Sequence, residues 1–307
     1  MNSWRKFKGE VWKESIDVRD FIQENYKPYT GITPKTKALL DDFHKLLKQE
    51  DENNGVLDME TEVVSQIDAY DPAYVDKDNE VIVGLQTDKP LKRAFHPFGG
   101  INIAKKAAEA YDYHINPELV HIFTRYRKTH NQGVYDVYTK EMRAVRKTGI
   151  VTGLPDGYGR GRIIGDYRRV PLYGIDRLVE EKQKEKDSYN GLMNEETIRA
   201  REEIQEQINA LNELKDLGSK YGFDLGRPAD NAKEAIQWMY FAYLGSVKEQ
   251  NGAAMSFGRD TLFTDIYIER DFEEGTLTES EAQELIDQLV LKLRMVRFAR
   301  TPEYNEL

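Results

Sequence analysis

The stretch GLPDGYGRGRIIGDYRRV, residues 153–170, lies in the middle of a chain whose formal net charge is −10. Within it, arginine and glycine are concentrated in a few residues, with arginines at Arg160, Arg162, Arg168 and Arg169. A planar guanidinium binds a carboxylate or phosphate through two parallel hydrogen bonds, and glycines let the backbone approach a ligand closely. The stretch is therefore a candidate site for a small anion. From these residues alone, a surface turn whose arginines pair with nearby carboxylates is the favoured interpretation.

The glycines of this stretch do not match a nucleotide-binding motif. Gly157, Gly159 and Gly161 miss the G-x-G-x-x-G spacing of a dinucleotide fingerprint by one residue, and no Gly-Lys-Ser/Thr follows as in a P-loop. A generic helical nucleotide-binding protein is therefore a weak interpretation.

Composition narrows the class of protein. Hydrophobic residues make up 39% of the 307 residues and charged residues 32%, as in a soluble globular protein, and the acidic balance argues against nucleic acid as a partner.

The absence of cysteine excludes a disulfide, a thiolate metal site or a cysteine nucleophile within this sequence. The five histidines form no metal-binding motif, so we expect no metal site. The longest apolar stretch, 235–245, is shorter than the ~20 residues that span a membrane, and no signal peptide is visible.

Periodicity predicts a mostly helical chain with a few short strands. The long helical connections between those strands favour parallel pairing. The apolar residues that surround 231–250 predict a buried helix. Helices are predicted over 17–26, 33–49, 101–111, 116–130, 139–149, 166–187, 194–222, 231–250 and 278–298, and strands or extended segments over 63–70, 80–87, 149–155 and within 251–260.

Nine blocks, in this order along the chain, resemble the amino-terminal part of the pyruvate formate-lyase (formate acetyltransferase) family of glycyl-radical enzymes. The resemblance covers the chain from about residue 11, and it depends on the order and density of the blocks. They are VRDFIQENYKPY, VGLQTDKPLKRA, FGGI, YRKTHNQGVYDVYT, TGLPDGYGRGRIIGDYRRV, NAKEAIQWMYFAYL, NGAAMSFGRD, YIERD and LKLRMVRFARTPEYNEL.

The resemblance implies both a fold and an activity. The family fold is a ten-stranded α/β barrel wrapped by helices, usually in a homodimer, of which residues 1–307 would be a single amino-terminal portion. The family's activity is the anaerobic, cytoplasmic conversion of pyruvate and coenzyme A to acetyl-coenzyme A and formate, a step of glucose metabolism. In that family a radical on a glycine, installed by an activating enzyme, passes to a pair of adjacent cysteines.

This sequence departs from the family in lacking those cysteines. We therefore expect a chain that ends before the cysteine pair and the radical glycine, contains no catalytic residue, binds no cofactor of its own and is inactive alone. Its coenzyme A site is unassigned. The alternatives are a catalytically dead scaffold or interaction module and a formate-lyase that acts on 2-ketobutyrate.

The resemblance also implies three substrate-binding residues. Arg162, the second arginine of GRGR, matches the family residue that binds the pyruvate carboxylate. Ala253 and Ala254, in NGAAMSFG, match a wall of small residues near the family's active site, although tight strand packing explains such residues nearly as well. We expect Arg160, Arg168 and Arg169 to form structural ion pairs.

Overall fold

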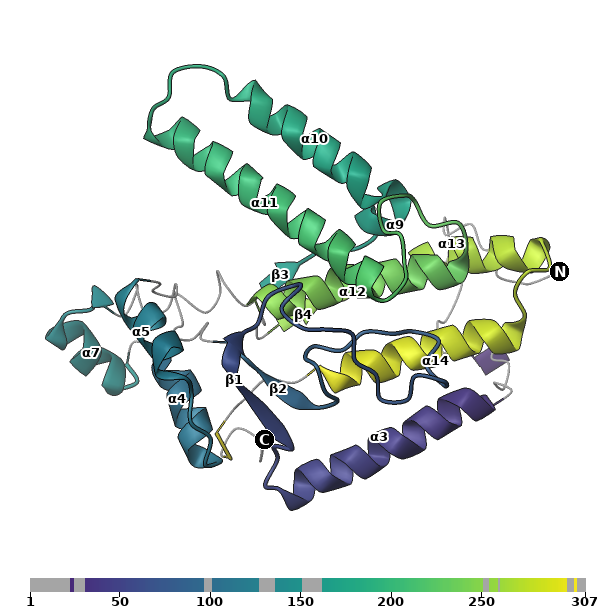
Figure 1. The fold of residues 1–307 in the computed structure, drawn as a ribbon, viewed down its shortest axis with the longest axis horizontal. Coiled ribbons are helices and arrows are strands. Elements are labelled where there is room, and N and C mark those ends of the chain that lie inside the picture. Colours follow the sequence, from purple (N-terminus) through teal and green to yellow (C-terminus); the bar gives the residue numbers. More distant parts are fainter. Residues whose placement is uncertain are drawn as a thin grey trace. The chain divides into compact units, whose positions relative to one another are not determined.

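The computed structural model describes residues 23–24, 31–96, 101–126, 136–150, 162–250, 254–258, 260–296 and 301–302. Contacts divide the chain into two compact units, residues 1–32 and 33–307, and the helices and strands below belong to the second. Figure 1 labels them in chain order. They are α3 (Pro34–Glu52), β1 (Asp58–Val64), β2 (Lys92–Phe95), α4 (Ile101–Ala110), α5 (Pro117–Arg125), α7 (Lys140–Lys147), β3 (Arg162–Ile164), α9 (Arg169–Tyr173), α10 (Ile175–Ser188), α11 (Glu195–Lys220), α12 (Ala232–Gln250), β4 (Ala254–Ser256), α13 (Asp260–Glu273) and α14 (Glu279–Met295).

Most of the helices begin where the sequence predicts. The Thr33 side chain accepts a hydrogen bond from the Thr36 amide, and the Asn116 side chain accepts one from the Glu118 amide. Each cap is followed by proline, which fits the first helical turn because its missing N–H has no partner there. The predicted helix over 17–26 lies largely outside the described residues.

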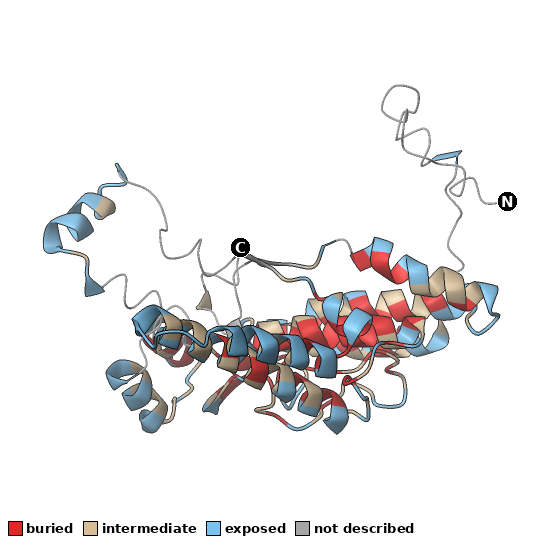
Figure 2. Ribbon diagram, turned by 90° about the horizontal axis from the view of Figure 1, so that it is seen from above, coloured by how far each residue is buried: buried red, intermediate tan, exposed pale blue. Residues whose placement is uncertain are grey.

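The core is built around α12, and the prediction of a buried helix there is confirmed. Helices α9, α11, α13 and α14 contact it, and Trp238, Met239 and Phe241 are fully enclosed. Figure 2 shows the buried residues in red. Burial of each large apolar side chain contributes roughly 1.5–3 kcal/mol to the stability of the fold. These contributions hold α12 firmly in place within this unit.

Residues 80–87, predicted as a strand or an extended segment, do not form a strand. The side-chain amide of Gln237, on α12, accepts a hydrogen bond from the Val83 amide and donates one to the Val83 carbonyl. Gln288, on α14, accepts from the Val81 amide. Because helix side chains satisfy these backbone groups, the apolar segment is buried without a partner strand.

The strands form two separate parallel pairs, as the long connections predict. β1 pairs with β2, and β3 pairs with β4. β1 ends at Val64, so only the first residues of the predicted segment 63–70 are in a strand. Of the predicted strand over 149–155, residues 151–155 lie outside the described part, and Ile150 is exposed.

The predicted helix over 166–187 is interrupted at Gly174. This residue has φ +71°, and a Cβ at its position would lie 2.3 Å from the Gly226 carbonyl oxygen. The Ile175 amide donates to the Leu225 carbonyl, which draws the two backbones together. Only glycine fits this approach, so α9 ends there and α10 begins.

Helix α13 was not predicted from the sequence. Its apolar residues do not gather on one face, since Phe263 is buried while Leu262 and Ile266 are exposed. An amphipathic pattern is the main signal of a surface helix, and this segment lacks it.

Candidate functional site

The pairing of β3 with β4 brings two of the three predicted substrate-binding residues together. Arg162 and Ala254 are directly paired by their Cα positions, followed by the pairs Ile163–Met255 and Ile164–Ser256. The third residue, Ala253, lies outside the described residues, as does Arg160. Two segments that are distant in sequence therefore meet at the position of the predicted carboxylate site, while the binding role of these residues stays a prediction.

Charged residues follow the carboxyl end of β3. The Arg168 guanidinium donates two hydrogen bonds to the Asp166 carboxylate, at 2.6 and 3.0 Å. This pairing lowers the pKa of Asp166. The predicted structural ion pair of Arg168 is therefore present, and its guanidinium is already occupied by a carboxylate.

A buried carboxylate follows the carboxyl end of β4. Asp260, the first residue of α13, is buried, and its Oδ2 has no hydrogen-bond partner among the residues that the structure describes. Burial raises the pKa of Asp260 to about 6, and the positive charge of Arg168 limits that rise. Each of the two parallel strands is thus followed by charged residues, at the same end of their sheet.

Three aromatic rings pack beside these strand ends. Tyr167 stacks on Phe257, with ring centroids 5.8 Å apart and planes inclined by 24°. Tyr243, on α12, meets both rings edge to face, at 5.6 Å from Tyr167 and 5.2 Å from Phe257. This aromatic cluster (Tyr167, Tyr243 and Phe257) connects both strand ends to the core helix.

One lysine is buried near the end of α12. Lys248 is 1% exposed, and its Nζ donates to the Ile67 carbonyl at 3.2 Å and lies 5.4 Å from the centre of the Tyr70 ring. Burial, reinforced by the charge of Lys220, lowers the pKa of Lys248 to about 8. In the sequence Lys248 stands beside Glu249 and Gln250 at the end of α12, so no local pattern identified it as buried.

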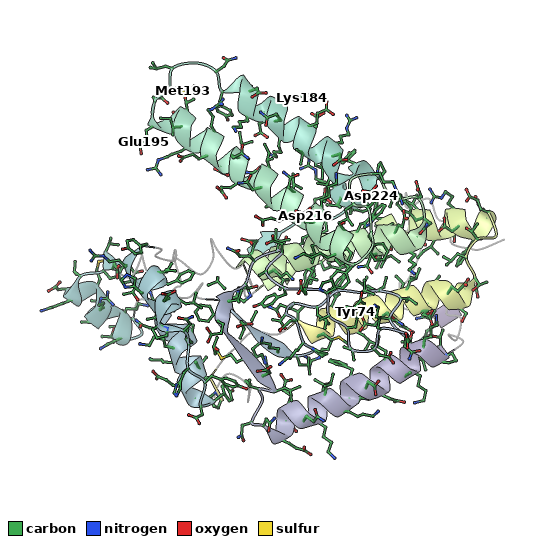
Figure 3. The ribbon with its side chains drawn as sticks, viewed as in Figure 1. Tyr74, Lys184, Met193, Glu195, Asp216 and Asp224 are labelled. Carbon is green, nitrogen blue, oxygen red and sulfur yellow. The ribbon has the colours of Figure 1, made fainter. Side chains whose placement is uncertain are left out.

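A hollow of about 660 Å³ opens beside α9, α10 and α11. Lys184, labelled on α10 in Figure 3, lines it and forms ion pairs with Glu180 and Glu181. Lys182 pairs with Glu185 at 2.7 Å in the same way. Because these lining charges neutralise one another, the hollow has no excess positive charge to select an anion.

The described part of the chain contains neither a metal-binding cluster nor a membrane-spanning helix. No group of three histidine, aspartate or glutamate side chains there is arranged to hold a metal ion. None of the helices described is both long enough and apolar enough to cross a bilayer.

Comparison with known proteins gives a relative of high identity. Formate acetyltransferase from Haemophilus influenzae is 53% identical over an alignment 317 positions long, which covers 99% of this chain and 41% of that protein. The chain thus spans about two fifths of this relative's length, in its amino-terminal part.

Solved structures share the fold at low sequence identity. The B12-independent glycerol dehydratase of Clostridium butyricum superposes with a TM-score of 0.68 at 18% identity, covering 91% of this chain and 42% of that one. Hydroxyproline dehydratase from Clostridioides difficile gives 0.63 at 17%, covering 85% and 40%. A glycyl radical enzyme from Archaeoglobus fulgidus gives 0.56 at 15%, covering 92% and 40%. The predicted fold class, part of a glycyl-radical-enzyme fold with many helices and few short strands, is confirmed.

The family model described as pyruvate formate lyase-like matches residues 11–307, nearly the whole chain. This match agrees with the blocks that carried the resemblance, which begin in the same region of the sequence. The chain belongs to the pyruvate formate lyase-like family.

Proposed function

We propose that this chain is the part of a formate acetyltransferase that holds the carboxylate of pyruvate. The whole enzyme converts pyruvate and coenzyme A to acetyl-coenzyme A and formate. The 53% identity to a formate acetyltransferase supports the activity. The observation that carries the site is the pairing of Arg162 with Ala254 on β3 and β4.

In this proposal, the Arg162 guanidinium forms two charge-assisted hydrogen bonds to the substrate carboxylate. Such bonds are roughly twice as strong as neutral ones, and the planar fork fixes the orientation of the carboxylate as well as its position. Ala253 and Ala254 leave room for the methyl ketone. The chain's contribution to catalysis is then to orient the carbonyl carbon for attack.

The bond-breaking groups come from outside these 307 residues. The sequence contains no cysteine, so the thiyl chemistry of the family requires cysteines and a radical glycine supplied by further polypeptide. The activating enzyme, coenzyme A and a second copy in a homodimer are partners of that complete enzyme, which we place in the cytoplasm of an anaerobically growing cell.

The absence of cysteine also favours a second candidate, a scaffold or interaction module without catalysis. The two differ in what they bind in a native extract. The enzyme hypothesis expects the chain to associate with a polypeptide that carries the cysteine pair, whereas a scaffold associates with unrelated proteins. A 2-ketobutyrate formate-lyase shares the carboxylate site, and competition between the two 2-oxo acids in the complete enzyme distinguishes it.

Substitution of Arg162 in the complete enzyme tests the proposal. Arg162→Lys keeps the charge but removes the bidentate geometry, so the KM for pyruvate is expected to rise about tenfold or more, equivalent to about 1.4 kcal/mol. Radical yield after activation, measured by electron paramagnetic resonance, stays unchanged. Arg168→Lys is the matched control, because that side chain is paired with Asp166 in the same segment. Equal pyruvate kinetics in the two variants contradict the role of Arg162.

A further inference from the structure

The pairing of β3 with β4 is short in the described part of the chain. There each strand has three residues, and no further strand pairs with either of them. A two-stranded sheet is marginally stable in water without further packing. A slip of one residue turns a strand's side chains to the opposite face of the sheet. Contacts beyond these three paired residues therefore help to fix the position of Arg162 against Ala254.

The aromatic cluster supplies such contacts at the carboxyl ends of both strands. Phe257 directly follows β4, and Tyr167 follows β3 after two intervening residues. Stacking of these two rings ties one strand end to the other, at a centroid distance of 5.8 Å. A favourable aromatic pair contributes about 0.5–1.5 kcal/mol beyond its buried area.

Tyr243 connects this stack to the core. It meets Tyr167 and Phe257 edge to face, and its neighbours Phe241 and Leu244 on α12 are fully buried. A side chain on so enclosed a helix has little freedom to move, because interiors are close-packed. The stack is therefore fixed relative to α12, and the strand ends are fixed with it.

Gly165 makes the close approach of the Tyr167 ring possible. A Cβ at position 165 would lie 2.5 Å from Cε1 and 2.6 Å from Cζ of Tyr167. Such distances are far inside van der Waals contact, and Tyr167 is 4% exposed, so its ring cannot move aside without leaving the cluster. Gly258, directly after Phe257, differs: a Cβ there meets nothing within 4 Å.

We propose that Gly165, Tyr167 and Phe257 are positioning residues that hold β3 in register on β4, so that Arg162 is presented correctly to the substrate. Gly165 admits the Tyr167 ring, the ring stacks on Phe257, and the stack sets the strand alignment. The proposal rests on the proposed carboxylate-binding role of Arg162.

Kinetics of the complete enzyme give the first test. Gly165→Ala displaces the Tyr167 ring, so the KM for pyruvate rises about tenfold while the KM for coenzyme A and the radical yield are unchanged. Tyr167→Phe keeps the ring and the wild-type KM, whereas Tyr167→Leu raises the KM. Gly258→Ala is the matched control and leaves the KM for pyruvate unchanged.

A double variant separates positioning from general destabilisation. In Gly165→Ala/Tyr167→Leu the clash is removed together with the ring, so the rise in KM equals that of Tyr167→Leu alone and is not multiplied. The proposal is overturned if the two substitutions multiply each other's effect on the KM for pyruvate. It is also overturned if the KM for coenzyme A rises in parallel with the KM for pyruvate. An Arg162→Lys variant with unchanged KM instead refutes the carboxylate site itself, while a raised KM there with no effect of Gly165→Ala refutes only the positioning role.

Cross-linking tests the register without relying on activity. Cysteines introduced by Ile163→Cys and Met255→Cys in the complete, unactivated enzyme replace a directly paired couple, at a strand spacing compatible with a disulfide. Copper–phenanthroline accepts the two electrons as the two thiols lose their protons and form the S–S bond. Peptide mapping finds the 163–255 link in the otherwise unchanged enzyme and with Tyr167→Phe, and loses it with Gly165→Ala. An undiminished link with Gly165→Ala overturns the proposal.

Discussion

Lys292, on α14, places its Nζ 2.5 Å from Oε2 of Glu80, and both side chains are fully enclosed. The other carboxylate oxygen of Glu80 accepts hydrogen bonds from the amides of Val75 and Asp76. Burial lowers the pKa of Lys292, although the Glu80 charge opposes that effect. Segment 75–80 is thus fixed to α14 by a charge pair that has no access to water.

Removal of the cation should destabilise the protein strongly. Lys292→Met leaves the Glu80 carboxylate buried without its counter-charge, and we expect the free energy of unfolding to fall by about 3–5 kcal/mol. Denaturant titration measures this change. The double variant Lys292→Met/Glu80→Gln should recover most of the loss, because a glutamine oxygen can still accept from the two amides. A loss below about 1 kcal/mol in the single variant contradicts this account.

Loss of the Gln237 side chain should also lower the free energy of unfolding, because this side chain bonds the Val83 backbone in place of a partner strand. Gln237→Leu leaves the amide and the carbonyl of Val83 without partners beside a fully buried helix, at a cost of about 1–3 kcal/mol for each group. Thermal or denaturant unfolding measures the change. Gln183→Leu is the control, since the Gln183 side chain donates to Asp187 on an exposed face of α10. Equal stability of the two variants contradicts the proposed role of Gln237.

The buried Lys248 should make stability depend on pH in the alkaline range. Its folded pKa, about 8, lies below its ordinary value of 10.5, so the unfolded chain binds more protons between these values. Stability therefore rises with pH across this window, and at neutral pH the charged side chain costs about 2–3 kcal/mol. Comparison with Lys248→Met from pH 7 to 11 isolates the effect. A stability difference that does not change with pH refutes it.

The 307-residue polypeptide alone should not turn over pyruvate. It has no cysteine to carry the acetyl group, and addition of the activating enzyme does not supply one to this chain. We expect no acetyl-coenzyme A in an anaerobic assay with pyruvate, coenzyme A and the activating enzyme, under conditions in which a complete formate acetyltransferase is active. Product formed by the isolated chain would contradict the proposal that the catalytic cysteines and the radical glycine come from further polypeptide.

Local sequence patterns were sufficient to predict the elements that depend on local chemistry. Neighbouring residues alone determine the helix caps at Thr33 and Asn116, and these caps were predicted correctly. The burial of α12 was also predicted correctly, because apolar residues surround that helix. The helix break at Gly174 was not, because it depends on the approach of the backbone near Gly226. For the segment around Val83, the sequence left a strand and an extended segment open, because its hydrogen-bond partners come from helices much later in the chain.

The candidate site divides in the same way. Arginine between glycines indicated an anion site, but the choice of Arg162 came from the family resemblance, and spacing alone could not show that it pairs with Ala254. Tyr167 and Asp260 gave no sequence signal, since their importance depends on the meeting of two strand ends. Contacts of this kind are set by tertiary packing, which periodicity does not report.

The two glutamine side chains that hold residues 81–83 have a consequence for solubility. An extended apolar stretch with unused amides and carbonyls is a template onto which another chain can add as a strand. Here Gln237 and Gln288 already occupy backbone groups of Val81 and Val83. The segment Val-Ile-Val is thereby protected against intermolecular strand addition, and this protection lasts only while α12 and α14 remain folded against it.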